Sequence, residues 1–96
     1  MNLFLRPGAA ADIEEAHAWY EAQRPGLGRE FLDAISGACR VLEESPRRFR
    51  VVHRDTRRAN LRRFPYSLFY RMVADDVVVI ACFHASRDPR RWQMRE

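Results

Sequence analysis

Residues 61–70 read Leu-Arg-Arg-Phe-Pro-Tyr-Ser-Leu-Phe-Tyr, and residues 77–83 read Val-Val-Val-Ile-Ala-Cys-Phe. Aromatic and apolar side chains alternate over residues 66–72, which predicts a strand with one buried face. The second stretch does not alternate, and an unbroken apolar run of this kind is typical of a strand buried on both faces in the middle of a sheet. Pro65 cannot donate to a strand ladder, so it fits the start of the first strand. We expect the two strands to form a hairpin with Asp75-Asp76 at its tip.

Two amphipathic helices are expected before this hairpin. Residues 9–23 place apolar side chains at helical spacing and gather acids in the first two turns, where the helix dipole favours anions. Residues 27–42 follow the same period more strongly, and Pro46 ends this helix because the residue before a proline avoids the α region. A break at residues 24–28 makes the two helices an α-hairpin with one apolar side. That side needs the sheet as its partner.

The remaining segments complete an α+β fold. Residues 3–6 predict a short strand, and residues 49–53 and 57–64 predict further extended segments. Asp88 and Pro89 predict a short C-terminal helical turn, with the aspartate as N-cap and the proline at the first position. The expected order is β-α-α-β-β-β with a short C-terminal tail. A helical hairpin then packs on a small twisted, mostly antiparallel sheet.

Composition indicates one globular domain spanning residues 1–96. The chain is 47% hydrophobic and 31% charged, which excludes a disordered chain. It has neither an apolar run of about 18 residues nor a signal peptide's apolar core, so we expect a cytoplasmic protein. Cys39 and Cys82 lie in apolar surroundings without a metal-ligand spacing, which favours buried reduced thiols over a disulfide or metal pair. No metal and no other cofactor is predicted.

Positive charge is concentrated in the second half of the chain. Residues 1–46 hold four Arg against eight acids, a balance of −4, whereas residues 47–96 hold thirteen Arg against five acids, a balance of +8. All 17 basic residues are Arg, whose planar fork binds phosphate and carboxylate. A GC-rich coding bias explains missing Lys equally well, but it does not explain the asymmetry. The second half therefore predicts an anion-facing surface.

The basic segment before Pro65 provides the first candidate binding residues. Arg58 and Arg62 share one face of an extended strand, and Arg63 points to the other. Such an edge suits nucleic-acid phosphates or an acidic protein segment. Trp92, which lies among arginines, suits either stacking on a base or packing of the tail on the sheet.

His84 is the candidate general acid or base. It directly follows the buried strand, and a neutral imidazole at a sheet end can act as a base near pH 7. The alternative is a structural histidine that is hydrogen-bonded to a loop backbone. His17 and His53 are expected on the surface, and no histidine spacing supports a metal site.

Five blocks of sequence occur in order along almost the whole chain. They are Asp12-Ile13 with Trp19-Tyr20-Glu21, Pro25-Gly26-Leu27-Gly28 with Phe31, Pro46, Arg63-Phe64-Pro65-Tyr66 with Tyr70, and His84-x-x-Arg87-x-Pro89-x-x-Trp92. Together they resemble the ParE/RelE toxin superfamily of the plasmid-stabilisation type. The resemblance implies a toxin of a bacterial type II toxin–antitoxin system, with a helical hairpin on an antiparallel sheet. It also implies an antitoxin whose C-terminal segment wraps the toxin.

The resemblance implies one of two activities. RelE-like members cut mRNA on the ribosome, whereas ParE-like members poison DNA gyrase. RNA-cleaving relatives commonly have an arginine where this chain has Ser67, use lysines that are absent here, and often have a C-terminal Tyr or His where this chain has Trp92. Only His84 remains for acid–base chemistry, with Arg63 or Arg87 to hold phosphate. These departures favour a gyrase inhibitor over an mRNA endoribonuclease. A third hypothesis is a degenerate toxin that only binds its antitoxin.

The antitoxin implied by the resemblance should have segments and charges that match this chain. An amphipathic antitoxin helix fits a groove left by the helical hairpin, an extended segment fits a sheet edge, and acidic residues match the arginine-rich half. The residues expected to bind the target or the antitoxin are Arg58, Arg62, Arg63, Tyr66, Arg87 and Trp92.

Overall fold

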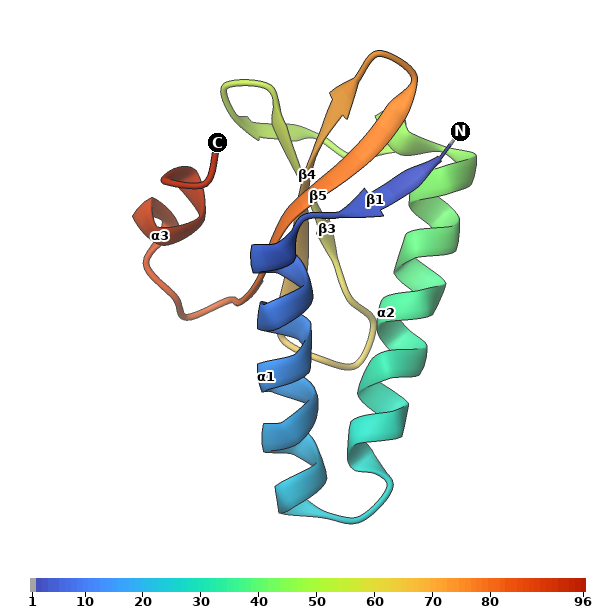
Figure 1. Ribbon diagram of the computed structural model, residues 1–96, viewed down its shortest axis with the longest axis vertical. Coiled ribbons are helices and arrows are strands. Elements are labelled where there is room, and N and C mark those ends of the chain that lie inside the picture. The colour runs from blue at the N-terminus through green and yellow to red at the C-terminus, as the bar shows by residue number, and fades with distance from the viewer. Residues whose placement is uncertain (1) are drawn as a thin grey trace.

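A five-stranded sheet in the order β1-β5-β4-β3-β2 supports two long helices (Figure 1). The structure is a computed structural model, and it describes residues 2–96. Its elements are β1 (Leu3–Leu5), α1 (Pro7–Gln23), α2 (Leu27–Glu44), the 3-10 turn η1 (Pro46–Arg48), β2 (Val51–His53), β3 (Thr56–Asn60), β4 (Tyr66–Val73), β5 (Asp76–His84) and α3 (Pro89–Gln93). β1 pairs parallel with β5, and all other neighbours are antiparallel. The predicted α+β class and mostly antiparallel sheet are confirmed.

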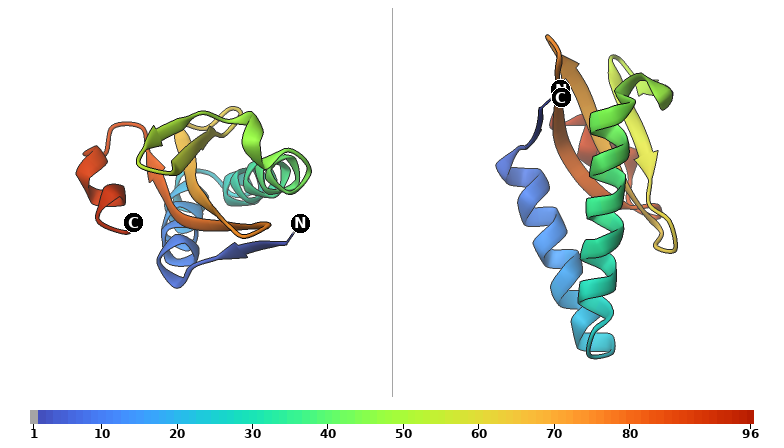
Figure 2. Two further views of the ribbon diagram at one scale, coloured as in Figure 1. Left: turned by 90° about the horizontal axis from the view of Figure 1, so that it is seen from above. Right: turned by 90° about the vertical axis from the view of Figure 1, so that its right-hand side faces the viewer.

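Helices α1 and α2 cover one face of the sheet, as the two views of Figure 2 show. Ile13 and Tyr20 on α1 and Phe31 on α2 enter one core with Leu68 and Tyr70 of β4. The rings of Tyr20 and Phe31 stack at 5.2 Å between centroids. The hairpin extends beyond the sheet at the turn that joins the helices (Figure 1). Part of its surface is therefore left without a strand beneath it.

The predicted central position of residues 77–83 is confirmed. They belong to β5, which lies between β1 and β4, and Val77, Val79 and Ile80 are fully buried. Burial on both faces explains the unbroken apolar run, because within residues 77–83 all side chains except that of Val78 are buried.

Strand β4 is buried on both faces, so the expected half-buried strand is wrong in this respect. Ser67 and Phe69 face away from the long helices, yet they are only 6% and 4% exposed. The C-terminal helix α3 covers this outer face, and its Trp92 stacks on Phe69 with 4.3 Å between ring centroids and 18° between planes. Asp88 caps α3 as predicted, because its side chain accepts a hydrogen bond from the Arg90 backbone N–H.

Three local predictions need correction. The sheet has one strand more than expected, because residues 51–60 fold into the hairpin β2–β3. The expected strand over residues 57–64 ends at Asn60, so Arg62 and Arg63 lie in a turn and do not point to opposite faces of a strand. The tip between β4 and β5 falls at Ala74 and Asp75, one residue early, with Ala74 in the left-handed region at φ 56°.

The first helix begins at Pro7 and not at Ala9, since proline is well suited to the first helical position. Its acids therefore lie beyond the first turn. The break between the helices is confirmed and depends on Gly26, whose φ is 91°. Glu21 accepts backbone hydrogen bonds from Gly26 and Gly28 and so closes the start of α2. Among the described residues, no helix combines the length and the apolar character that crossing a membrane requires.

Candidate functional site

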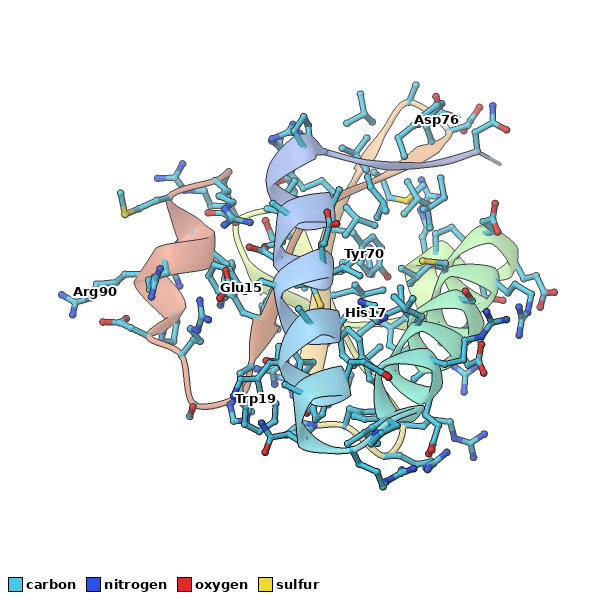
Figure 3. The ribbon with its side chains drawn as sticks, turned by 60° about the horizontal axis from the view of Figure 1, so that its bottom comes forward. Glu15, His17, Trp19, Tyr70, Asp76 and Arg90 are labelled. Atoms are coloured by element: carbon cyan, nitrogen blue, oxygen red, sulfur yellow. The ribbon has the colours of Figure 1, made fainter. Side chains whose placement is uncertain are left out.

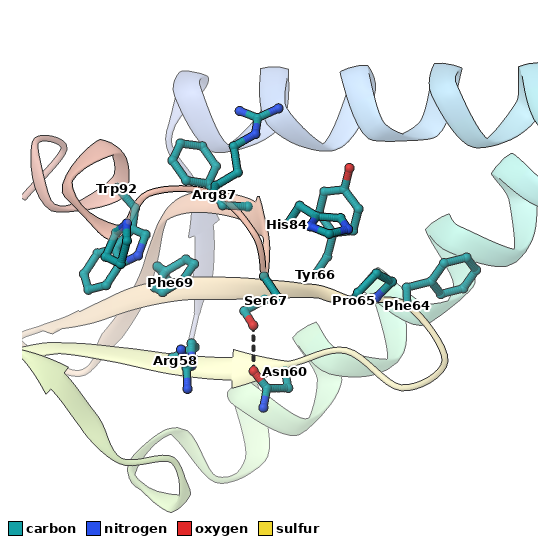
Figure 4. A pocket seen from close by; sticks show the side chains of 13 residues that line it. Arg58, Asn60, Phe64, Pro65, Tyr66, Ser67, Phe69, His84, Arg87 and Trp92 are labelled. Carbon is teal, nitrogen blue, oxygen red and sulfur yellow. Dashed lines mark hydrogen bonds between the residues drawn. The ribbon is translucent and has the colours of Figure 1, made fainter.

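A groove of about 370 Å³ opens on the outer face of the sheet, opposite α1 and α2, and continues around the ends of β4 and β5 to Tyr66 and His84, which lie on the helix side (Figure 4). We call it the outer groove. It is formed by the ends of β3, β4 and β5, by the segment that follows β5, and by α3. Its lining residues are Arg58, Asn60, Phe64, Pro65, Tyr66, Ser67, Phe69, Phe83, His84, Ala85, Arg87, Pro89 and Trp92.

The outer groove is positively charged. None of the residues that line it is acidic, and Arg58 makes no ion pair within the described part of the chain. Arg87 reaches Glu15 across 3.4 Å, but this carboxylate is 75% exposed, so the pair contributes little. Three guanidinium groups approach the Phe83 ring: those of Arg87, Arg91 and Arg95 lie 5.3, 5.9 and 4.8 Å from its centroid. Cations thus outnumber anions along this part of β5.

His84 stands at the end of β5, and its ring is held by its own loop. Its Nδ1 accepts a hydrogen bond from the Ser86 backbone N–H at 3.0 Å and lies 2.8 Å from Ser86 Oγ. Because a backbone N–H can only donate, the neutral imidazole has its proton on Nε2. The ring edge packs against Tyr66, with 5.2 Å between centroids and 84° between planes. His84 therefore has a donor at Nε2, whereas its lone pair is engaged.

Two polar side chains form the floor beside the aromatic residues. Ser67 Oγ donates to Asn60 Oδ1 at 2.6 Å, across the β3–β4 pairing (Figure 4). The hydroxyl is used in this bond, and the Asn60 amide N–H groups remain as donors. An arginine at the position of Ser67, as the resemblance implied for RNA-cleaving relatives, is absent from this floor.

The structure brings four of the six predicted binding residues together and separates the other two from them. Arg58, Tyr66, Arg87 and Trp92 line the outer groove together with His84. The other two, Arg62 and Arg63, lie in the turn after β3 and outside this groove. Arg63 instead pairs with Glu30 of α2 at 2.7 Å. It is therefore separated from His84, with which it was grouped as a possible catalytic residue.

A second groove, of about 540 Å³, lies between α2, η1 and β3. We call it the helix groove. Small residues on α2 form one wall, and Phe49 and Arg62 belong to the opposite side. Its lining residues are Asp33, Ala34, Gly37, Ala38, Val41, Arg48, Phe49, Ala59, Asn60 and Arg62. A groove beside the helical hairpin is expected from the sequence, but its position is not, because alanine and glycine on a helix face are equally compatible with close packing.

The two residues at the C-terminal end bind the tail to two different parts of the fold. Arg95 pairs with Asp12 of α1 through two hydrogen bonds, one of them 3.0 Å long. Glu96, whose side chain is 3% exposed, lies 2.6 Å from His53 Nδ1 and accepts a hydrogen bond from Thr56. These contacts keep α3 on the outer face and fix one wall of the outer groove. His53 is half-buried as a result, contrary to the surface position expected for it.

The remaining histidine and the thiols play structural parts. His17 was expected on the surface, but it is half-buried where α1 meets Gly28 of α2. Cys39 and Cys82 are both free, and burial raises the pKa of the Cys82 thiol to about 12. Within residues 2–96, no three His, Cys, Asp or Glu side chains are grouped closely enough to hold a metal ion.

Comparison with known proteins gives the family. The model of the ParE toxin of the type II toxin–antitoxin system parDE matches residues 3–89. The chain therefore belongs to the ParE toxin family. A solved structure described as the chromosomal ParDE TA system from P. aeruginosa has the same fold, with a TM-score of 0.79 and 19% identity over 88% of this chain and 95% of that chain. No curated protein matches the chain.

Family membership makes this protein the toxin component of a type II toxin–antitoxin system, and an antitoxin is its implied partner.

Proposed function

We propose that the toxin inhibits DNA gyrase and that its cognate antitoxin neutralises it. The hydrogen bonding of His84 supports an inhibitor that acts by binding its target, and it argues against an enzyme. Hydrolysis or transesterification of RNA needs a base to activate a hydroxyl and an acid for the leaving oxygen. His84 Nδ1 is engaged by Ser86, so the ring has no free lone pair in its neutral form.

The neighbouring residues do not replace that base. Arg87 stays protonated at any ordinary pH, and the indole of Trp92 has no ionisable proton near neutrality. Arg63 lies in the turn after β3, paired with Glu30. The outer groove can therefore hold an anion but lacks a second group for proton transfer.

The direct experiment is supercoiling by purified gyrase with the toxin added and the antitoxin withheld. We expect supercoiling to fall as the toxin approaches the gyrase concentration, and prior mixing with antitoxin to restore it. Unimpaired supercoiling at a large excess of toxin would contradict the proposal. Cleavage of mRNA in cells, lost on His84→Ala, would establish the endoribonuclease instead. Harmless overexpression without either effect would indicate a degenerate toxin.

The helix groove is the proposed binding site of the antitoxin. Ala34, Gly37 and Ala38 keep this face of α2 shallow, so another helix can approach closely. Arg48 and Arg62 line the same groove, neither forms an ion pair among the described residues, and an amphipathic helix with acidic residues on its polar face matches them.

Charge reversal tests this assignment. We expect Arg62→Glu to weaken antitoxin binding by about tenfold, and more at low salt than at high salt. Arg54→Glu, an identical charge change at the β2–β3 turn, is the matched control. Equal losses in the two variants, or an affinity that does not change with salt, would place the antitoxin elsewhere.

A further inference from the structure

We propose that a cleft beside α1 binds a proline-rich segment of a partner protein in the polyproline II conformation. The cleft lies between the second half of α1, the start of β4 and the segment after β5, and its volume is about 480 Å³. We call it the aromatic cleft, after Trp19, Tyr20, Tyr66 and His84 in its lining. This binding goes beyond gyrase inhibition and does not depend on it.

The four aromatic rings form a continuous row from the helix to the sheet. Trp19 and Tyr20 of α1 meet edge to face, with 5.1 Å between ring centroids. Tyr20 lies 6.0 Å from Tyr66 of β4, and Tyr66 lies 5.2 Å from His84 at the end of β5. The planes of neighbouring rings differ by 84°, 64° and 84°, so these rings do not stack on one another. Together they present an aromatic wall that three elements build.

Trp19 leaves more than half of its surface uncovered. It is 57% exposed, whereas Tyr20, the next residue, is 9% exposed. Trp19 follows Glu15 by four residues and lies on the same side of α1, as Figure 3 shows. Because a large exposed aromatic side chain at a cleft is typical of a binding surface, we expect this ring to be the centre of the contact.

The aromatic cleft has no net charge. The charged side chains that line it are one carboxylate, Glu15, and one guanidinium, Arg87, which lie 3.4 Å apart. An anion in the cleft would meet the like charge of Glu15, and a cation stacked on the rings would meet the like charge of Arg87. We therefore expect the part of the ligand that contacts the rings to be uncharged.

The polar groups that remain free in the aromatic cleft can all donate a hydrogen bond. Among residues 2–96, the hydroxyls of Tyr20 and Tyr66 form no hydrogen bond, and both reach the surface. Burial raises the pKa of both phenols, so each keeps its proton at neutral pH. In Figure 4 the Tyr66 hydroxyl lies on the side of β4 nearer to α1. Trp19 adds an indole N–H, which can only donate. The ligand should accordingly be rich in acceptors.

A proline-rich segment matches the rings, the charge and the donors together. Proline has no N–H, and a polyproline II backbone forms no internal hydrogen bonds, so its carbonyl oxygens are free to accept. A helical partner uses its carbonyls internally, and an ordinary extended chain brings one N–H with each carbonyl. Apolar pyrrolidine rings pack on aromatic side chains, and aromatic-lined grooves recognise polyproline II segments by this combination.

The test is fluorescence anisotropy of a labelled peptide of about ten prolines, titrated with the intact toxin at low and at high salt. A flexible peptide of Gly and Ser with the same length is the first control. We expect the proline peptide to bind at least about tenfold more tightly than this control. Its affinity should change by less than about twofold with salt, because the cleft has no net charge.

Intrinsic fluorescence gives a second measurement. The chain has two tryptophans, and Trp92 is 6% exposed and stacked on Phe69, so Trp19 gives the solvent-exposed emission. Binding of the proline peptide to the wild type should move this emission to shorter wavelength and reduce its quenching by acrylamide.

Matched variants locate the binding. Trp19→Ala should weaken binding of the proline peptide by at least about tenfold. Tyr66→Phe keeps the ring but removes the donor, and it should weaken binding by about threefold. Phe4→Ala removes an aromatic side chain that is 52% exposed on β1, outside the cleft, and should change the affinity by less than about twofold. Thermal melts of all three variants verify that the fold is retained.

Four outcomes would overturn the inference: equal binding of the Gly and Ser peptide, equal effects of Trp19→Ala and Phe4→Ala, an affinity that falls steeply with salt, or displacement of the peptide by tetramethylammonium at similar concentrations. The last outcome would assign the rings to a cation. Gyrase inhibition is measured in a separate supercoiling assay. Inhibition without peptide binding would remove this inference alone, and peptide binding without inhibition would remove the proposed function alone.

Discussion

Asp12 and Arg95 lie 83 residues apart in the chain and form an ion pair beside β5. Figure 3 shows the two parts of the chain that the pair connects, α1 with Glu15 labelled and the C-terminal region with Arg90 labelled. Arg95 Nη2 donates to Asp12 Oδ1 at 3.0 Å, and Asp12 Oδ2 accepts both from Arg95 and from the Cys82 backbone N–H. Arg95 also donates to the Ile80 carbonyl at 3.3 Å. Because β1 ends before it reaches this part of β5, the ion pair takes the place of a strand partner.

Replacement of Asp12 tests this role. Asp12→Ala should lower the free energy of unfolding by about 2 kcal/mol, because it leaves the Cys82 N–H and the Arg95 guanidinium without their acceptor. Urea denaturation measures the change. Glu14→Ala, an exposed acid on the same helix, should stay within about 0.5 kcal/mol of the wild type. Equal effects of the two substitutions would mean that the pair contributes no more than a surface charge.

Trp92 anchors α3 to the outer face. Trp92→Ala should lower the free energy of unfolding by about 3 kcal/mol, because it removes the stacked contact with Phe69 and exposes the apolar outer face. Met94 lies two residues further on and is 85% exposed, so Met94→Ala should be nearly neutral. Denaturant unfolding of both variants gives the comparison. A Trp92→Ala protein as stable as Met94→Ala would show that α3 is dispensable for the fold.

Two glycines of α2 should respond to alanine in opposite directions. A Cβ on Gly28 would lie 2.8 Å from His17 Cδ2 and 2.9 Å from Glu21 Oε1, so Gly28→Ala should destabilise by about 1–3 kcal/mol. A Cβ on Gly37 would meet only Arg40, at 3.8 Å. Gly37→Ala should therefore stabilise by about 0.5–1 kcal/mol through helix propensity. Thermal melts that shift in the same direction would contradict the predicted close contact between α1 and α2.

The stability that Asp88 contributes by capping α3 should decrease in acid. The Arg90 side chain, and then the Arg90 backbone N–H, lower the pKa of Asp88 from 3.8 to about 2. A carboxylate whose pKa is lowered in the folded state contributes stability above its unfolded value, and this contribution is lost as pH falls toward the folded value. The stability difference between wild type and Asp88→Asn should be constant above about pH 5 and shrink between about pH 4 and pH 2. A difference that does not change over this interval would show that the capping contact is absent in solution.

Much of the fold could be predicted from periodicity and from residues that end elements. The apolar run of β5 has no polar position to turn toward water, so its central place follows from composition alone. Pro46, Gly26 and Asp88 act through their own backbone or side-chain geometry, and each begins or ends an element near the predicted position. Of the residues that line the outer groove, the sequence predicts Arg58, Tyr66, Arg87 and Trp92 as binding residues, but it does not predict that they lie together.

Other features depend on contacts between distant segments. The alternation over residues 66–72 places Phe69 on the face opposite the predicted buried one, and nothing nearby in the sequence indicates that Trp92 covers it. The sequence alone determined the two helices, the central strand and the sign of the charge, because spacing and residue type act locally. Only the tertiary structure decided that Arg62 and Arg63 leave the outer groove and that Ser86 engages His84, because a turn or a loop sets where a side chain points whatever its chemistry.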